Sequence, residues 1–235
     1  MKKLLALLGI ILLAGCTEAT EQPIPDPDVV EDLNETYDFT NGDSDFSEGI
    51  ADLPTDYKDL EYDKESTIGK HETYAPTLDA YWLTVQNRNS DVFYLIAREI
   101  EGLTANETYT GTIKVSVFTT VEAAESVYLK AGLVNHAISI KDVEGNYELS
   151  NIDKGNHGEG GDDLLVAGDL GENQELVTET ENDDYPQYKV EYTVEVTVTT
   201  NEDGSVFLVV GFDSLLEGLN IVGINEITVD LEIQE

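Results

Sequence analysis

The stretch Tyr188–Val198, YKVEYTVEVTV, decides the fold, because every second residue in it is apolar and the residues between are charged or hydroxylated. This strict period of two predicts a β-strand with one buried face and one face in water. Asn201–Gly204 then supplies a turn in which Gly204 can take positive φ, and Ser205–Phe212 returns as a second strand. Near the C-terminus, Ile227–Ile233 alternates in the same way.

Outside these segments, most of the chain also has the pattern of short strands. Further strands are predicted at residues 80–87, 91–101, 109–120, 126–134 and 163–168. Val121–Ser126 and Ser214–Leu219 are predicted to be short helices. Many short strands without long helices between them predict an all-β fold, a two-sheet antiparallel β-sandwich or jelly roll.

The charge of the chain limits its partners. The 235 residues include 49 acidic and 12 basic side chains, which gives a formal net charge of −37. Nucleic acid is excluded as a partner, because its binding depends on Lys and Arg contacts to phosphate. The acidic residues are spread along the chain, which favours a role in keeping the protein hydrated over a role in storing cations.

The N-terminal segment, MKKLLALLGIILLAGC, has the form of a secretory signal. Lys2 and Lys3 precede the apolar run Leu4–Ala14, which is shorter than the roughly 20 residues that cross a bilayer. The sequence Leu13–Cys16 resembles the lipobox of bacterial lipoproteins, and Cys16 is the only cysteine of the chain. That resemblance implies removal of residues 1–15 and acylation of Cys16, which anchors the protein to a membrane.

The same resemblance implies a place in the bacterial cell envelope. Thr17 after the cysteine favours the outer membrane, while nothing in the sequence tells which leaflet the protein faces. Residues 16–36 combine the modified cysteine with a proline-containing acidic stretch, which predicts a flexible tether spanning roughly 25 Å. The expected organisation is a signal peptide at 1–15, a tether at 16–36 and a single sandwich domain at 37–235.

Several motifs resemble a known architecture. Gly102–Tyr109, GLTANETY, resembles the Gly-Leu-x-x-x-x-x-Tyr entry into a central strand of galactose-binding-like jelly rolls, which include many carbohydrate-binding modules. Tyr37–Phe39 and Ile224–Val229 are similar to the first and last strands of that architecture. Asn151–Asn156 and Glu125–Gly132 resemble segments of a group of uncharacterised bacterial lipoproteins. These resemblances imply a fold and assign no reaction.

Sugar recognition needs an aromatic face for stacking and polar groups for the hydroxyls. Tyr81 and Trp82 are the candidate platform, and Asn87 and Arg88 follow as candidate hydrogen-bonding residues. Adjacent residues of a strand face opposite ways, so one of the two aromatic rings belongs to the core. The alternative is that Trp82 packs inside the sandwich and that the segment around Arg88 is an ordinary hairpin turn.

Two acidic, glycine-containing loops are candidates for a structural calcium site, because calcium prefers six to eight oxygen ligands. The candidate ligands are Asp43, Asp45, Asp153, Asp162 and Asp163. Neither loop has the spacing of an EF-hand, and acidic loops also arise by chance in so acidic a chain. His157 lies in the second loop near carboxylates and could ligate a transition metal, although one imidazole does not make a site.

A hydrolase is a weaker interpretation. Gly42–Asp45 resembles the Gly-Asp-Ser nucleophile block of one hydrolase family, but the Asp-x-x-His partner motif does not occur. The arrangement to check is Ser44 or Asp43 beside His71. We therefore expect a non-enzymatic envelope lipoprotein that binds a carbohydrate-like ligand, with structural calcium as a possible addition. The alternative is a structural or assembly lipoprotein that binds another envelope protein and no small ligand.

Overall fold

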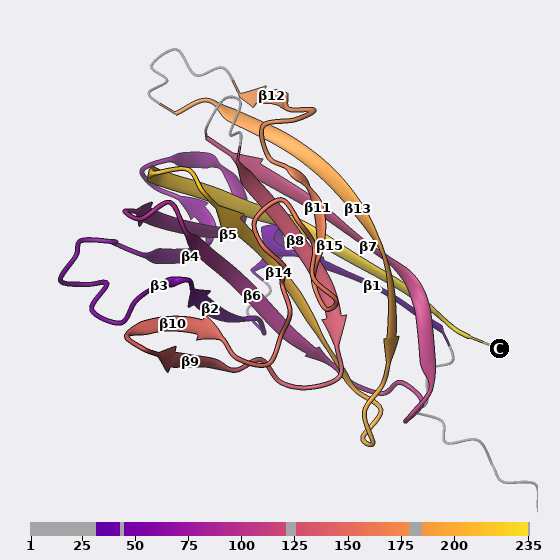
Figure 1. The fold of residues 1–235 in the computed structure, drawn as a ribbon. Coiled ribbons are helices and arrows are strands. Elements are labelled where there is room, and N and C mark those ends of the chain that lie inside the picture. Colours follow the sequence, from indigo (N-terminus) through magenta and orange to yellow (C-terminus); the bar gives the residue numbers. More distant parts are fainter. Residues whose placement is uncertain (1–31, 43–44, 121–125, 179–184, 235) are drawn as a thin grey trace, which may run out of the picture.

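The structure is a computed structural model, and it describes residues 32–42, 45–120, 126–178 and 185–234 (Figure 1). No helix in these ranges is long and apolar enough to span a bilayer. The elements in chain order are β1 (Asp32–Asp38), η1 (Phe39–Asn41), β2 (Ser47–Ala51), β3 (Leu53–Pro54), β4 (Glu65–His71), β5 (Ala75–Asn87), β6 (Val92–Ile100), β7 (Thr108–Thr119), β8 (Val127–Val134), β9 (Ile140–Val143), β10 (Asn146–Leu149), β11 (Leu165–Asp169), β12 (Glu175–Thr178), β13 (Gln187–Thr199), β14 (Val206–Ser214) and β15 (Gly218–Ile233).

The strands form three antiparallel sheets. The seven-stranded sheet has the order β12-β13-β7-β15-β5-β4, and β1 pairs with the C-terminal half of β15. The five-stranded sheet has the order β11-β8-β14-β6-β2, and a three-stranded sheet joins β3, β10 and β9. In Figure 1 the long strands β7, β13 and β15 curve along the molecule, with β12 near the top of the view and the β9–β10 hairpin at the lower left. The predicted all-β sandwich is confirmed.

The main core lies between the inner faces of the two larger sheets. Val190, Val194, Val196 and Val198 of β13 are at most 7% exposed and belong to this core. They face inner-side residues of the five-stranded sheet such as Phe212, which is fully buried. The alternation that predicted a half-buried strand in β13 is therefore confirmed.

The prediction of a helix at Ser214–Leu219 is wrong. β14 ends at Ser214 and β15 begins at Gly218, so only a short extended connection separates them. Side chains hold this connection: the Ser214 hydroxyl accepts from Leu216 N at 3.1 Å, and Asn220 Nδ2 donates to Leu216 O at 3.0 Å. Of the other predicted helix, residues 121–125 lie outside the described ranges.

The domain also begins earlier than predicted. Asp32–Thr36, which the sequence assigned to the tether, belongs to β1 and pairs with the end of β15. Leu33 and Tyr37 from this strand are buried at 5% and 4% exposure. Leu33 stands alone among polar and acidic residues, so the sequence shows no strand pattern here. Its burial depends on β15, whose paired residues lie almost 200 positions further along the chain.

The predicted entry into a central strand is confirmed at Gly102–Tyr109. Tyr109 is the second residue of β7 and is fully buried. Its hydroxyl accepts a hydrogen bond from Thr104 N at 3.0 Å, which closes the turn onto the strand. Gly102 takes φ +85°, a conformation that glycine adopts without strain.

Both sheets carry a smaller apolar cluster on the outer face. On the five-stranded sheet, Phe93, Leu95 and Val209 are covered by Ile152 and Leu164 from the segment between β8 and β11. On the seven-stranded sheet, the covered residues include Trp82, Phe118 and Ile221, with Tyr74 packed against them. The remaining outer face of the seven-stranded sheet is left to solvent and holds the groove described below.

Candidate functional site

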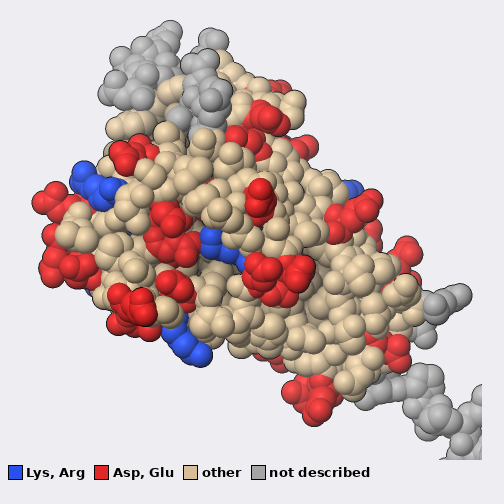
Figure 2. All heavy atoms as spheres, viewed as in Figure 1, with Lys and Arg blue, Asp and Glu red and all other residues tan. Residues whose placement is uncertain are grey.

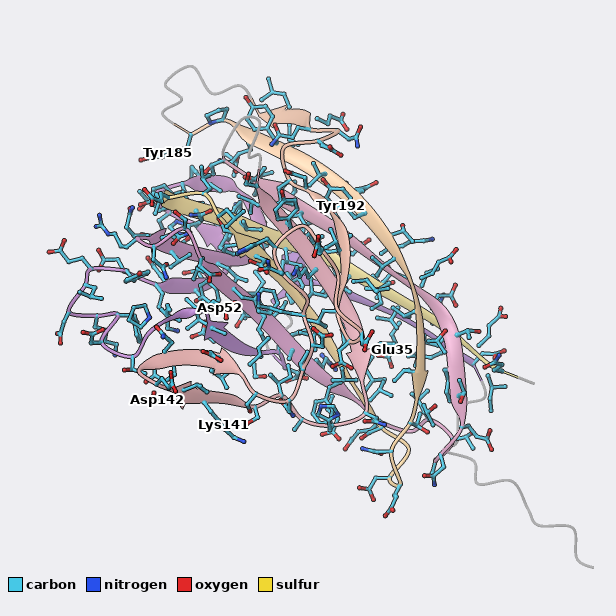
Figure 3. All side chains as sticks on the ribbon, in the orientation of Figure 1. Glu35, Asp52, Lys141, Asp142, Tyr185 and Tyr192 are labelled. Atoms are coloured by element: carbon cyan, nitrogen blue, oxygen red, sulfur yellow. The ribbon has the colours of Figure 1, made fainter. Side chains whose placement is uncertain are left out.

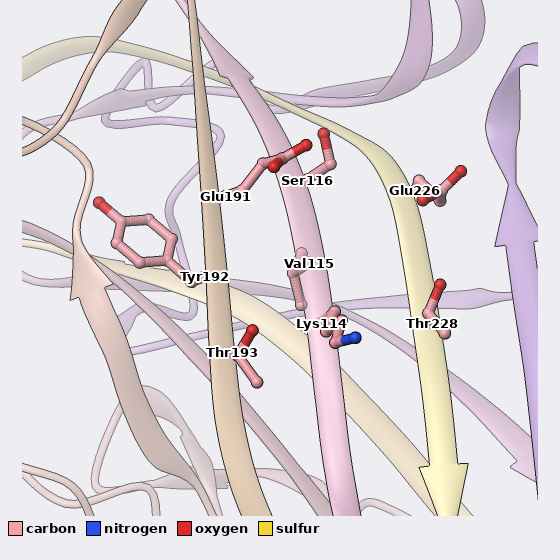
Figure 4. A pocket seen from close by; sticks show the side chains of 8 residues that line it. All are labelled: Lys114, Val115, Ser116, Glu191, Tyr192, Thr193, Glu226 and Thr228. Carbon is pink, nitrogen blue, oxygen red and sulfur yellow. The ribbon is translucent and has the colours of Figure 1, made fainter.

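The outer face of the seven-stranded sheet carries a groove of about 430 Å³ over β13, β7 and β15. Its lining residues are Lys114, Val115, Ser116, Glu191, Tyr192, Thr193, Glu226 and Thr228. Figure 4 shows that these side chains come from three neighbouring strands, so their backbones are fixed by continuous ladders of hydrogen bonds.

Strand register places the polar side chains of the groove in two rows. Ser116 of β7 lies directly between Glu191 of β13 and Glu226 of β15. Lys114, two residues back, lies between Thr193 and Thr228.

Residues directly opposite in antiparallel strands have Cβ atoms about 4.5–5.5 Å apart, so each row brings its side chains within reach of one small ligand. The groove thus combines two carboxylates that accept hydrogen bonds, three hydroxyls that donate and accept, and one ammonium that donates.

Lys114 is the cationic donor of the groove. Glu191 is paired instead with Lys189, whose Nζ lies 2.6 Å from Glu191 Oε1. In the part of the chain that the structure describes, Lys114 has no carboxylate within 4.0 Å. Its ammonium is therefore free to donate to a ligand.

Tyr192 does not supply an aromatic platform to the groove. In Figure 4 its ring lies on the other side of β13 from Glu191 and Thr193. The Tyr192 hydroxyl donates to the carbonyl oxygen of Asp169, and burial together with the charges of Asp169 and Glu172 raises the pKa of Tyr192 to about 12. The ring therefore packs β11 against β13 and leaves the groove without an aromatic face.

The prediction that Tyr81 and Trp82 bind a ligand is wrong. Trp82 is fully buried, and Tyr81 is 6% exposed within the main core. Trp82 does lie on the outer face of the sheet, but the end of β4 and the following turn cover it: its Nε1 donates to Gly69 O at 3.0 Å, and His71 packs edge-on against it. Neither ring has a free face for stacking.

Asn87 and Arg88 also have structural partners. Asn87 is 1% exposed, and its Nδ2 donates to Ser214 O at 3.0 Å and Leu216 O at 3.2 Å, so it is not available to a ligand. Arg88 is exposed, and its Nε donates to Glu61 O at 3.1 Å. The structure therefore corrects the prediction at Asn87 and leaves Arg88 at the surface, away from the residues that line the groove.

The second acidic loop uses its carboxylates to bind its own backbone. Asp153 accepts from Gly155 N at 2.9 Å and from Asp162 N at 3.1 Å, and these hydrogen bonds lower the pKa of Asp153. Asp163 Oδ2 accepts from Asp153 N at 2.7 Å. These contacts give Asp153 and Asp163 a role in closing the loop, and calcium binding there stays a prediction.

The remaining predicted residues fall into two groups. Asp45 is exposed and lies 3.8 Å from Arg98, measured from Oδ2 to Nη2. Asp43, Ser44 and Cys16 lie outside the described residues, so neither lipidation nor the weak hydrolase interpretation is tested.

A buried charge cluster lies on the opposite side of the sandwich, on the outer face of the five-stranded sheet. Asp213 of β14 and Lys130 of β8 are both fully buried, with Lys130 Nζ 3.0 Å from Asp213 Oδ2. Lys154 Nζ reaches the same oxygen at 2.8 Å and lies 2.9 Å from Asp52 Oδ2. His157 Nδ1 lies 3.2 Å from the other oxygen, Asp213 Oδ1.

The lysines determine the ionisation of this cluster. Burial opposes the charge of Asp213, but the charges and hydrogen bonds of Lys154 and Lys130 outweigh it, and the pKa of Asp213 is lowered. Burial lowers the pKa of Lys130, which Asp213 only partly offsets. For Lys154, burial is outweighed by Asp213 and Asp52, and its pKa is raised.

Sequence reasoning missed both the groove and the cluster. The polar side chains of the groove occupy outward positions of three neighbouring strands, and the alternation of apolar and polar residues that places them outward is present in the sequence of β13. Which strands become neighbours is not readable from one sequence, so Lys114 and Glu226 could not be placed together. Asp213 and Lys130 were missed because a charged residue within an apolar strand gives no sign of its partner.

Comparisons with known proteins give a likeness of shape. No protein-family model matches the chain, and no curated protein matches it. A mannan-recognising carbohydrate-binding module, TmCBM27, is similar over 86% of this chain and 98% of its own, with 13% identity and a TM-score of 0.40. The K3 cleaved adhesin domain of Lys-gingipain from Porphyromonas gingivalis is similar over 84% of this chain and 98% of its own, with 13% identity and a TM-score of 0.39.

A third solved structure, of a CBM4, is similar over 83% of this chain and 91% of its own, with 12% identity and a TM-score of 0.28. With TM-scores below 0.5, none of these likenesses assigns a ligand or a reaction to this chain.

Proposed function

We propose that the protein is a non-catalytic binding domain that holds a hydroxyl-rich ligand of the carbohydrate class in the groove over β13, β7 and β15. The observation that carries this proposal is the pair of rows Glu191–Ser116–Glu226 and Thr193–Lys114–Thr228. Carboxylates, hydroxyls and an ammonium on a rigid ladder match the donors and acceptors of adjacent sugar hydroxyls.

Charge and shape narrow the class of ligand. The net charge of −37 and the two glutamates of the groove disfavour anionic ligands such as nucleotides or acidic glycans. The groove lacks a stacking ring, so we expect a weak interaction with neutral sugars, with a Kd on the order of 1 mM, equivalent to about −4 kcal/mol. Tight binding would require several copies of the domain on one polymer.

Binding can be tested by titrating the full chain with neutral, acidic and basic oligosaccharides and following amide chemical shifts by NMR. We expect shifts in β7, β13 and β15 with neutral sugars, and their loss in Glu226→Gln and Lys114→Met. Asp230→Asn is the matched control, because Asp230 is exposed on the same strand but does not line the groove. Equal binding by Glu226→Gln and Asp230→Asn would rule out the groove.

We also propose that Cys16 is acylated and holds the domain at the cell envelope, which the Leu13–Cys16 motif supports. Cys16→Ser should move the protein from the membrane fraction to the soluble fraction, and the mass of the N-terminal peptide should lose its lipid. Recovery of the Cys16→Ser protein in the membrane fraction would contradict the anchor.

An assembly role is the second candidate, favoured by the end of the molecule at β12. Leu176 and Val177 of this strand are 43% and 40% exposed, and Tyr185, labelled in Figure 3, is 38% exposed. Within the described residues, β12 pairs with β13 alone, so its other edge can accept another strand. Loss of a protein partner in Leu176→Lys, with sugar binding unchanged, would favour this role.

A further inference from the structure

Three side chains from distant parts of the chain converge at the edge of the buried charge cluster. Asp91 precedes β6, His157 lies in the loop between β10 and β11, and Asp213 is the penultimate residue of β14. One ligand atom from each lies within 4.8 Å of the other two, and no other such group of His, Cys, Asp and Glu occurs in the described residues. Asp52, labelled in Figure 3, marks this region on the ribbon.

The distance between two of these atoms suits one bound ion. His157 Nδ1 and Asp213 Oδ1 are 3.2 Å apart. Two ligands that bind a tetrahedral zinc ion at about 2.0–2.1 Å stand about 3.3 Å from one another. An ion can therefore replace the hydrogen bond between this pair with little movement of either side chain.

The lysines leave the required oxygen accessible. Lys130 and Lys154 both contact Oδ2 of Asp213, whereas His157 faces Oδ1. The carboxylate can thus bind an ion through Oδ1 while the two ammonium groups hold Oδ2, the arrangement in which outer partners orient a metal ligand.

Asp91 provides a carboxylate without a cation of its own. In the described chain it makes no hydrogen bond or salt bridge. The three carboxylates of Asp52, Asp91 and Asp213 outnumber the two ammonium groups of Lys130 and Lys154, and this excess of negative charge attracts a cation.

The loop that carries His157 is fixed in place by the same cluster. Lys130 Nζ donates to Lys154 O at 2.7 Å and to Glu159 O at 3.3 Å, on either side of His157. The His157 side chain is 23% exposed, so an ion can reach it from solvent. The imidazole is therefore both positioned and accessible.

We propose that Asp91, His157 and Asp213 form a binding site for a divalent first-row transition metal, with Zn²⁺ as its reference ion. One imidazole nitrogen and two carboxylates are a donor set that suits Zn²⁺, Co²⁺ or Mn²⁺ better than Ca²⁺, which prefers oxygen alone. His157 belongs to the second acidic loop, but both carboxylates of the site, Asp91 and Asp213, come from outside the two loops predicted from sequence. The site lies on the opposite side of the sandwich from the groove.

The test is titration of the full chain with Zn²⁺ by calorimetry and with Co²⁺ by visible absorption, in excess Mg²⁺ and NaCl to suppress non-specific binding to the acidic surface. We expect one ion per chain, a Co²⁺ spectrum typical of a nitrogen ligand, and an increase in Tm with Zn²⁺. His157→Asn should weaken Zn²⁺ binding about tenfold or more. Asparagine suits this position because His157 has φ +47°.

His136→Asn is the matched control, since His136 faces Asn135 and Asn151 outside the cluster, and it should bind Zn²⁺ like wild type. Asp91→Asn gives an independent test that leaves the lysine contacts intact, and it should also weaken binding. Circular dichroism in metal-free buffer establishes that each variant is folded. Absence of Zn²⁺ binding by wild type, or equal affinity in wild type, His157→Asn and Asp91→Asn, would overturn the proposal.

Discussion

Lys130 shows how one buried side chain can hold a whole loop. Its ammonium is fully buried and meets Asp213 Oδ2 as well as the carbonyls of Lys154 and Glu159. Three acceptors match the three N–H donors of a lysine, so the charge is compensated and every donor is used. Breaking such a pair from one side leaves an uncompensated buried charge, which costs more than the pair itself contributes.

We predict that Lys130→Met lowers the free energy of unfolding by about 3–5 kcal/mol, the range for removing one partner of a buried ion pair. Urea denaturation followed by circular dichroism measures this change. The control is Lys141→Met on β9, where the lysine is exposed and should contribute within about 0.5 kcal/mol. If both variants unfold at the same urea concentration, the cluster does not stabilise the fold.

The lowered pKa of Asp213 predicts how stability depends on acid. Because the folded-state pKa lies below the unfolded value of about 3.9, the unfolded chain binds more protons between the two values. The stabilising contribution is complete above the unfolded pKa and is lost as pH falls through the folded pKa. The difference in unfolding free energy between wild type and Asp213→Asn should thus be largest above about pH 5 and shrink below about pH 4.

Urea unfolding of wild type and Asp213→Asn from pH 3 to pH 7 measures this difference in free energy. Because both proteins contain the other carboxylates, the contribution of those groups cancels in the difference. A difference in the free energy of unfolding that stays constant across this pH range would show that the lysines do not stabilise the Asp213 carboxylate.

Among the strands, β15 determines how the seven-stranded sheet is assembled. Its first half pairs with β5 and its second half with β1, while β7 pairs along its other edge. A bulge at Asn225 separates the halves, and Asn225 Nδ2 donates to Asp79 O at 3.1 Å. One long strand thus brings β1 and β5 into the same sheet without pairing them to each other.

The pairing of β1 gives a prediction about where the domain begins. Leu33→Ala should lower the free energy of unfolding by about 2–4 kcal/mol, because it removes a side chain that is 5% exposed in the main core. Asn34→Ala, whose side chain is exposed on the same strand, should change it by less than about 0.5 kcal/mol. Thermal and urea unfolding of the full chain would measure both. An effect of Leu33→Ala as small as that of Asn34→Ala would show that Asp32–Thr36 does not stabilise the domain and belongs to the tether.

At the scale of the whole molecule, the sequence predicted what depends on local pattern. The alternation in β13 and β15 specified an all-β sandwich, and the entry at Tyr109 was recognisable from its neighbours. β1 was missed because its burial depends on a distant partner strand, and Trp82 was assigned to a binding face because no local feature shows that the turn after β4 covers it. The groove and the metal-ligand cluster are each formed by residues far apart in the sequence, so local patterns could not predict either of them.

The acidic surface carries the last prediction. Figure 2 shows acidic side chains over the whole visible face with few basic ones between them, and the formal net charge is −37. Self-repulsion at this charge destabilises the compact state, and salt screens it, with a Debye length that falls from about 30 Å at 0.01 M to about 3 Å at 1 M. The urea midpoint should therefore rise from about 0.01 M to about 1 M NaCl. KCl should act equally, since screening depends on ionic strength, and a midpoint that is unchanged or falls would show that surface repulsion does not limit stability.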